Sequence, residues 1–162
     1  MSNFENSLMK LRNCSEKSEK GQALVEFSLV TLLFFTVVFG ISEFGRALWT
    51  WNTIVQATRT GARYAVVESP TSDDMQIMKV VAYNDPNATS SSKPVVPGLS
   101  ETNVRVRYLN NDGTVAGNKN VADLIEVSVI NYQFSFLVPL FGTQISLPSF
   151  TTSLPLEGLG AV

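Results

Sequence analysis

The chain has 162 residues, room for one ordinary domain and little more. Its 12 Lys and Arg against 14 Asp and Glu give a net charge of -2, which argues against a dedicated nucleic-acid binder because such proteins carry a basic surplus. The absence of histidine and the single Cys14 exclude Ser-His-Asp and Cys-His nucleophile systems, His-based metal sites and an internal disulfide. We therefore expect no enzyme, and no catalytic residue, metal, cofactor or small-molecule substrate.

An apolar run, QALVEFSLVTLLFFTVVFGI, covers residues 22–41. As a helix with a rise of about 1.5 Å per residue, it would cross the roughly 30 Å of bilayer hydrocarbon. Residues 1–21 are polar and more basic than the flank beyond the run, so we expect the N-terminus in the cytoplasm and the C-terminus outside. A cleaved secretory signal peptide is the rival interpretation. It would have a shorter apolar region and a small-x-small site, which the following ISEFGRALW does not offer.

Glu26 is the one charge within this run. A carboxylate inside a bilayer costs about 2.5–3.5 kcal/mol on insertion scales, so it is either a tolerated interfacial residue or a functional one. Its spacing favours function, because a basic leader, Gly21, four residues, Glu26 and an apolar helix form the substrate pattern of prepilin peptidases. Cleavage after Gly21 would free an amine on Gln22. That amine could pair with the Glu26 carboxylate of the same or a neighbouring subunit.

Three motifs follow one another along this part of the chain. They are Gly21, Glu26 and Phe27, then Glu43, Gly45 and Arg46, then Arg59, Gly61, Ala62 and Arg63. Together they resemble the TadE-like pseudopilins of the tight-adherence (Tad, type IVc) pilus system, strongly over about residues 20–67 and more loosely beyond. A C-terminal region of about 95 residues favours a minor pilin over the much shorter major Tad pilin.

The resemblance implies a structural assembly protein of the bacterial inner membrane. It would be trimmed by a prepilin peptidase and would then act with other pilins or pseudopilins and the Tad assembly platform, in the pilus or at its base or tip. The implied role is pilus assembly and, through the pilus, cell adhesion. The alternative is a single-pass adaptor protein that is never cleaved and binds partners through its extracytoplasmic domain. The N-terminus of the mature protein distinguishes the two.

The helix of the apolar run is predicted to continue to Val67, because an apolar stripe persists and no proline appears before Pro70. The stripe comprises Ala47, Trp51, Ile54, Val55, Thr58, Ala62, Ala65 and Val66. We accordingly divide the chain into a leader (1–21), a transmembrane part (22–41), an extracytoplasmic part of the helix (42–67) and a head (68–162). Arg59 and Arg63, one turn apart, form either a solvated face or a docking site for an acidic partner.

The head is predicted to be pilin-like α+β, with a short helix and a small antiparallel sheet of about three strands. Thr71 or Ser72 should cap the helix, and Met75 and Met78 should lie on its apolar side. Alternating residues predict strands at 104–108, 124–138 and 144–147, a return strand at 114–116 after an Asp-Gly turn, and an extended tail at 153–162. The apolar face switches within 124–138, which requires a bulge or break near Ile130–Asn131.

An apolar cluster lies at the end of the longest predicted strand. It comprises Phe134, Phe136, Leu137, Leu140 and Phe141. Five large apolar residues exceed what one strand face buries in so small a sheet. They either pack on the long helix or, around Phe136, Leu140 and Phe141, form a partner patch.

Overall fold

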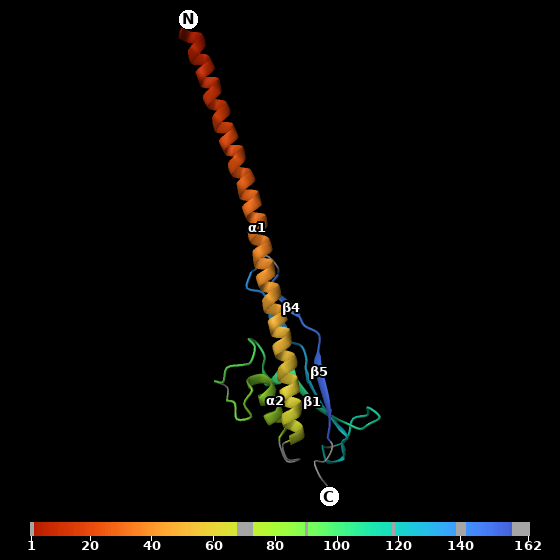
Figure 1. The fold of residues 1–162 in the computed structure, drawn as a ribbon. Helices are drawn as coiled ribbons and strands as arrows, with labels where there is room; N and C mark the ends of the chain where they lie inside the picture. Colours follow the sequence, from red (N-terminus) through yellow and green to blue (C-terminus); the bar gives the residue numbers. More distant parts are fainter. Residues whose placement is uncertain (1, 68–72, 90, 118, 139–141, 157–162) are drawn as a thin grey trace. The chain divides into compact units, whose positions relative to one another are not determined.

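The computed structural model describes residues 2–67, 73–89, 91–117, 119–138 and 142–156, with side chains from Gly21 onward. It contains two compact units, Met1–Glu43 and Phe44–Val162. Its elements are α1 (Ser2–Val67), α2 (Asp74–Tyr83), β1 (Val104–Leu109), β2 (Leu124–Val129), β3 (Gln133–Ser135), β4 (Gln144–Ser146) and β5 (Phe150–Pro155), with 3-10 turns at Glu101–Asn103 and Lys119–Val121 (Figure 1). The predicted α+β fold is confirmed: a long N-terminal helix, a short second helix and a three-stranded antiparallel sheet, to which a two-stranded sheet is added.

Helix α1 ends at Val67, as predicted, but begins at Ser2 rather than near Gly21. Ten of the 21 leader residues are Leu, Lys, Glu or Met, which favour helix, and the leader contains no proline. Gly21 alone cannot end a helix, since a glycine in a helix interior costs only about 1 kcal/mol. The leader and the apolar run are therefore one continuous helical segment.

Within the second unit, α1 buries one side against the head. The buried residues of this side are Thr50, Ile54, Ala57, Thr58, Gly61, Ala62 and Ala65. They recur at three- and four-residue steps, as the predicted stripe requires. Trp51 departs from the prediction, because it stays 40% exposed and places its ring edge-on to Phe150 at 4.6 Å. Thr58 meets Thr152 through their hydroxyl groups at 3.2 Å, so β5 lies along this face of α1.

Helix α2 begins one or two residues later than predicted. Asp73 is its N-cap and accepts the Met75 N–H at 3.2 Å, which corrects the predicted cap at Thr71 or Ser72, two residues outside the described ranges. Asn84 ends the helix in the left-handed conformation, with φ of 58°. The buried side consists of Ile77, Val80, Val81 and Ala82, whereas Met75 is exposed, contrary to the prediction. Asp73 caps because its carboxylate directly precedes the first free N–H groups.

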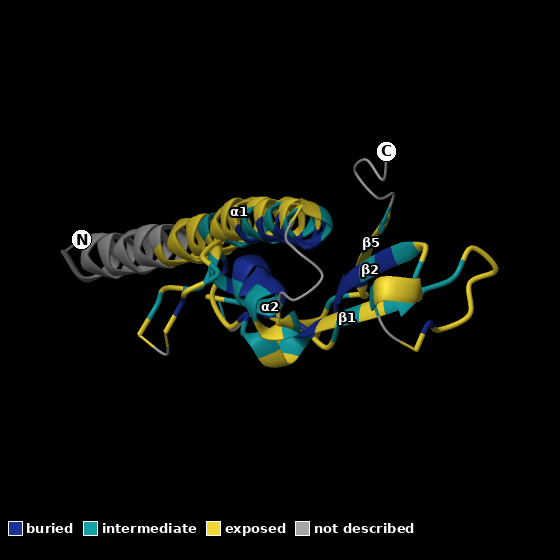
Figure 2. Cartoon of the chain, turned by 90° about the horizontal axis from the view of Figure 1, so that it is seen from below, coloured by how far each residue is buried: buried dark blue, intermediate teal, exposed yellow. Residues whose placement is uncertain are grey.

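The main sheet has the order β1-β2-β5, with β2 in the centre (Figure 2). Three residues lie side by side across the sheet: Val106, Val127 and Thr152. The sheet face that carries their side chains also carries the apolar core. The opposite face carries the Arg107–Glu126 ion pair. β1 confirms the first predicted strand. The chain returns antiparallel to β1 at 114–116, as predicted, but the return is a single bridge between Leu109 and Val115 and not a full strand.

The third strand of the main sheet is β5, which the sequence did not predict. Residues 153–155, assigned to an extended tail, instead pair with β2. The segment predicted as the third strand forms β4 and pairs with β3 in the separate sheet. The predicted break near Ile130–Asn131 is confirmed: β2 ends at Val129, and Asn131 adopts φ of 55° before β3 begins. This left-handed residue turns Phe134 inward, where it is almost fully buried.

Tyr108 joins the sheet to α2, because its hydroxyl donates to Oδ1 of Asp74. Burial, followed by this hydrogen bond and the negative charge of Asp74, raises the pKa of Tyr108 far above its ordinary 10. The unfolded phenol ionises near pH 10 while the folded one stays protonated. The stabilisation is thus complete below about pH 10 and is lost as the pH rises above it. We expect urea midpoints to fall less between pH 9.5 and 11 for Tyr108→Phe than for the wild type, and equal falls would contradict this assignment.

Candidate functional site

The predicted processing site lies on an exposed stretch of α1. Gly21, Gln22, Glu26 and Phe27 are all helical and exposed. A Cβ placed on Gly21 would meet no atom within 4 Å, so packing does not require a glycine there. A protease must unwind a helix before it can bind the bond between Gly21 and Gln22 in extended form, and glycine lowers the cost of that unwinding. Gln22 and Glu26, four residues apart, occupy the same helix face.

The apolar run exposes almost all of its large side chains. These are Leu24, Val25, Phe27, Leu29, Val30, Leu32, Leu33, Phe34, Phe35, Val37, Val38, Phe39 and Ile41. Two of the hydroxyl groups among them bond within the helix, since Ser28 and Thr36 donate to the carbonyls of Leu24 and Leu32 at 2.7 and 2.8 Å. This is what a helix needs in lipid, where water cannot solvate free hydroxyl groups. The segment that starts at Gly21 is long and apolar enough to cross a membrane.

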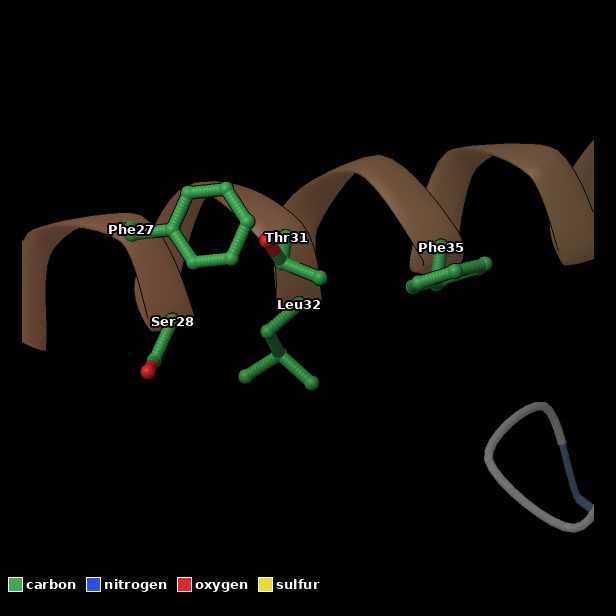
Figure 3. A pocket seen from close by; sticks show the side chains of 5 residues that line it. All are labelled: Phe27, Ser28, Thr31, Leu32 and Phe35. Carbon is green, nitrogen blue, oxygen red and sulfur yellow. The ribbon is translucent and has the colours of Figure 1, made fainter. Parts of the chain in front are cut away.

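A shallow hollow of about 360 Å³ lies on this surface (Figure 3). It is lined by Phe27, Ser28, Thr31, Leu32 and Phe35. None of its lining residues is charged, and most of the lining atoms are carbon. The Ser28 hydroxyl already donates to the Leu24 carbonyl of the same helix. The hollow thus suits an apolar side chain or an acyl chain better than a charged group. Phe27, one of the predicted assembly residues, forms one end of it.

In the second motif, Arg46 attaches the small sheet to α1. Its guanidinium lies 5.1 Å from the centre of the Phe134 ring, and Nη2 donates to the Ser135 carbonyl at 3.3 Å. Glu43 is 4% exposed, and Gly45 faces open space, with no atom within 4 Å of an added Cβ. Arg46 thereby has a structural role in the head that the sequence motif alone did not specify.

In the third motif, Gly61 and the two arginines behave differently. Gly61 is buried where α1 meets α2, and a Cβ there would lie 2.2 Å from Cγ2 of Val81. Glycine is therefore required for the two helices to approach this closely. Arg59 and Arg63 are exposed on the opposite side of α1, as both interpretations of this pair require. The motif combines a packing residue with two solvent-facing cations.

The structure divides the predicted partner patch. Phe134 belongs to the core, and Phe136 is half-buried with its ring edge-on to that of Phe134 at 5.4 Å. Leu137 is 72% exposed. Leu140 and Phe141 lie outside the described residues, so the patch that they would form with Phe136 stays a prediction.

Sequence reasoning missed a cavity of about 150 Å³ in the head. It is lined by Arg46, Thr50, Pro97, Gly98, Tyr132, Gln133, Phe134 and Ser135. Its walls come from α1, the loop before β1 and the β3 strand, and no sequence pattern links three segments so far apart. Burial raises the pKa of Tyr132, although nearby Arg46 opposes the shift, and the Tyr132 hydroxyl donates to the Pro97 carbonyl at 2.8 Å. Across the described ranges, no three His, Cys, Asp or Glu side chains gather to hold a metal ion.

Comparison with protein families matches residues 21–63 to the family described as TadE-like protein. The match begins at Gly21 and ends at Arg63, so it contains all three motifs and confirms the resemblance over this segment. No curated protein and no solved structure matches the chain.

Proposed function

We propose that the chain is a minor pilin or pseudopilin of a Tad-type pilus, cut between Gly21 and Gln22 by a prepilin peptidase. The observation that carries this proposal is the start of the TadE-like match at Gly21, the residue at which the leader is expected to end. The exposed apolar surface from Leu24 to Ile41 supports it, since such a helix is suited to a membrane and then to neighbouring subunits. The orientation with the leader in the cytoplasm belongs to the same proposal.

The chemistry of the proposed step follows from the helix geometry. Hydrolysis of the bond between Gly21 and Gln22 leaves a carboxylate on the leader and an α-amine on Gln22. This cation starts one helical turn before Glu26, close enough to offset the desolvation of its carboxylate in the same subunit or in the next. In the uncleaved chain, Glu26 lacks the Gln22 amine as a partner. Cleavage would thus prepare the helix for leaving the bilayer and packing among other pilins and the assembly platform.

The second candidate is an uncleaved membrane adaptor protein whose head binds partners. It is favoured by the continuity of α1, which runs through Gly21 without a break. N-terminal sequencing and intact mass of protein extracted from membranes of cells with an active prepilin peptidase separate the two functions. A first residue of Gln22 supports the pilin, whereas an intact Met1 rejects cleavage and leaves the adaptor.

Replacing Glu26 tests its role in assembly. Glu26→Leu makes the span more apolar, so we expect membrane insertion to improve or stay equal. We expect pilus number to fall about tenfold or more, because the Gln22 amine loses its partner. Surface pili are counted by electron microscopy, with membrane fractions measured in parallel. Glu26 is exposed and belongs to the first compact unit, outside the core of the head, so the melting temperature of the head should not change. Normal piliation would show that Glu26 is a tolerated interfacial residue.

A further inference from the structure

The exposed side of α1 stays apolar well beyond Ile41, the last residue of the apolar run. The exposed large side chains that follow are Phe44, Leu48, Trp49 and Trp51. The exposed residues at 52–63 are all polar. Among the described side chains of α1, no exposed residue between Glu26 and Arg59 carries a charge. The surface of the helix therefore changes from apolar to polar after Trp51, and not at the end of the run.

The two charged residues just beyond Ile41 contribute little to this surface. Glu43 is only 4% exposed. The Arg46 guanidinium lies 5.1 Å from the centre of the Phe134 ring and donates to the Ser135 carbonyl. A charge that faced lipid would cost about 2.5–3.5 kcal/mol on insertion scales. Because both charges are held by protein, this level of α1 can face lipid although its sequence is charged.

Exposed apolar side chains at this level point in several directions. Phe44 and Leu48 share one face of α1, whereas Trp49 lies about 140° round the axis from Phe44, by five residues at about 100° each. Leu137 adds an exposed side chain from the head, because it is 72% exposed and lies within about 7 Å of Ser135, two strand residues away, whose carbonyl Arg46 binds. One partner helix would cover a single stripe. A lipid surface would surround the helix and meet all four.

The thickness of a bilayer agrees with this level. Twenty residues of helix rise about 30 Å, so a hydrocarbon layer that begins just after Glu26 ends near Arg46. The headgroup region adds about 5–7 Å, or about four to five residues, which reaches Trp49 and Trp51. Tryptophan rings favour this region, and the chain has no other tryptophan. The same placement leaves Glu26 at the opposite boundary, where its carboxylate can reach water.

We propose that the base of the head, formed by Phe44, Leu48, Trp49 and Leu137, lies in the headgroup region of the membrane that α1 crosses. The occupant of this surface is lipid, because the surface continues the apolar span and extends round the helix. The contact would hold the head against the bilayer. The proposal rests on membrane insertion of α1, which is part of the proposed function, but not on cleavage or on pilus membership.

The test uses the native tryptophans of the full chain in phosphatidylcholine vesicles. Bromine quenches tryptophan fluorescence on contact, so lipids brominated near the headgroup end or near the methyl end of their acyl chains report depth. Trp51→Phe leaves Trp49 as the only fluorophore. We expect bromine at the headgroup end to quench Trp49 about twofold more than bromine at the methyl end. Acrylamide in the water should quench Trp49 less than a residue that faces water.

Leu137 is compared with a matched position at the other end of the head. Val115 is nearly as exposed, 69% against 72%. It bridges to Leu109, at the end of the main sheet that β5 reaches only beyond Thr152 and its contact with Thr58. Thr58 lies about two turns of helix beyond the base of the head. In chains whose two tryptophans are replaced by phenylalanine, we expect lipid bromine to quench Leu137→Trp, and acrylamide alone to quench Val115→Trp.

Phe34→Trp, within the apolar run, separates failure of this proposal from failure of membrane insertion. In the same tryptophan-free chain it should be quenched most by bromine at the methyl end. If it is quenched while Trp49 and Leu137→Trp are not, the head stands clear of the bilayer, and the base of the head is left to a protein partner. If Phe34→Trp is not quenched either, membrane insertion is rejected together with this contact. Equal lipid quenching of Leu137→Trp and Val115→Trp would also overturn the proposal, because it would show unspecific adsorption of the head.

Discussion

Gly21→Phe is expected to abolish processing and leave Met1 at the N-terminus of the membrane-bound protein. A bulky residue before the cut resists unwinding and fills the space in which a peptidase must hold the backbone. The substitution should leave the fold intact, because nothing packs on Gly21. Cys14 provides a direct measurement: the leader carries the single thiol, so only the uncleaved chain reacts with a maleimide.

Gly21→Ala is the matched control, since alanine is small and its Cβ would meet no atom within 4 Å. We expect that variant to be cut and to lose its thiol as the wild type does. Thiol labelling that is equally strong for wild type, Gly21→Ala and Gly21→Phe would show that the chain is not cleaved at this bond. Loss of the thiol in Gly21→Phe would instead place the cut elsewhere.

The long helix and the break after β2 could be predicted because each depends on a local pattern. The spacing of apolar residues predicts that α1 continues to Val67. The buried side of the chain switches between Val129 and Phe134, which requires an extra residue, and Asn131 supplies it in the left-handed conformation. The N-terminal limit of α1 at Ser2 could not be predicted from apolar spacing, because the leader is polar and mixes helix-favouring Leu, Lys, Glu and Met with Ser and Asn.

The sheet order could not be predicted, because it depends on pairing between distant segments. Phe150–Pro155 has short polar side chains that alternate weakly, and nothing in it indicates that it pairs with the centre of the sheet. The same limit applies to the functional residues. The sequence singled out Arg46 and Gly61 within motifs, but their contacts with Phe134 and Val81 arise only when α1 meets residues that follow it along the chain.

Gly61→Ala is expected to destabilise the head by about 1–2 kcal/mol. The added methyl would lie 2.2 Å from Cγ2 of Val81, and overpacking of this kind costs about 1–3 kcal/mol. The better helix propensity of alanine offsets up to about 1 kcal/mol of that cost. The overlap is with a β-branched side chain that has little freedom to rotate away, so the helices must separate slightly. The free energy of unfolding is measured by urea titration of the purified chain in detergent.

Two further variants assign the effect to the contact between α1 and α2. Gly45→Ala, in the same helix but facing open space, should stabilise by up to about 1 kcal/mol, because only helix propensity changes. Val81→Ala removes the methyl group that the new alanine side chain in Gly61→Ala would meet. The loss of unfolding free energy in the double variant should therefore be smaller than the sum of the two single losses, by about 1 kcal/mol or more. Strict additivity, or a loss in Gly45→Ala equal to that in Gly61→Ala, would mean that the third motif retains its glycine for a reason other than close helix packing.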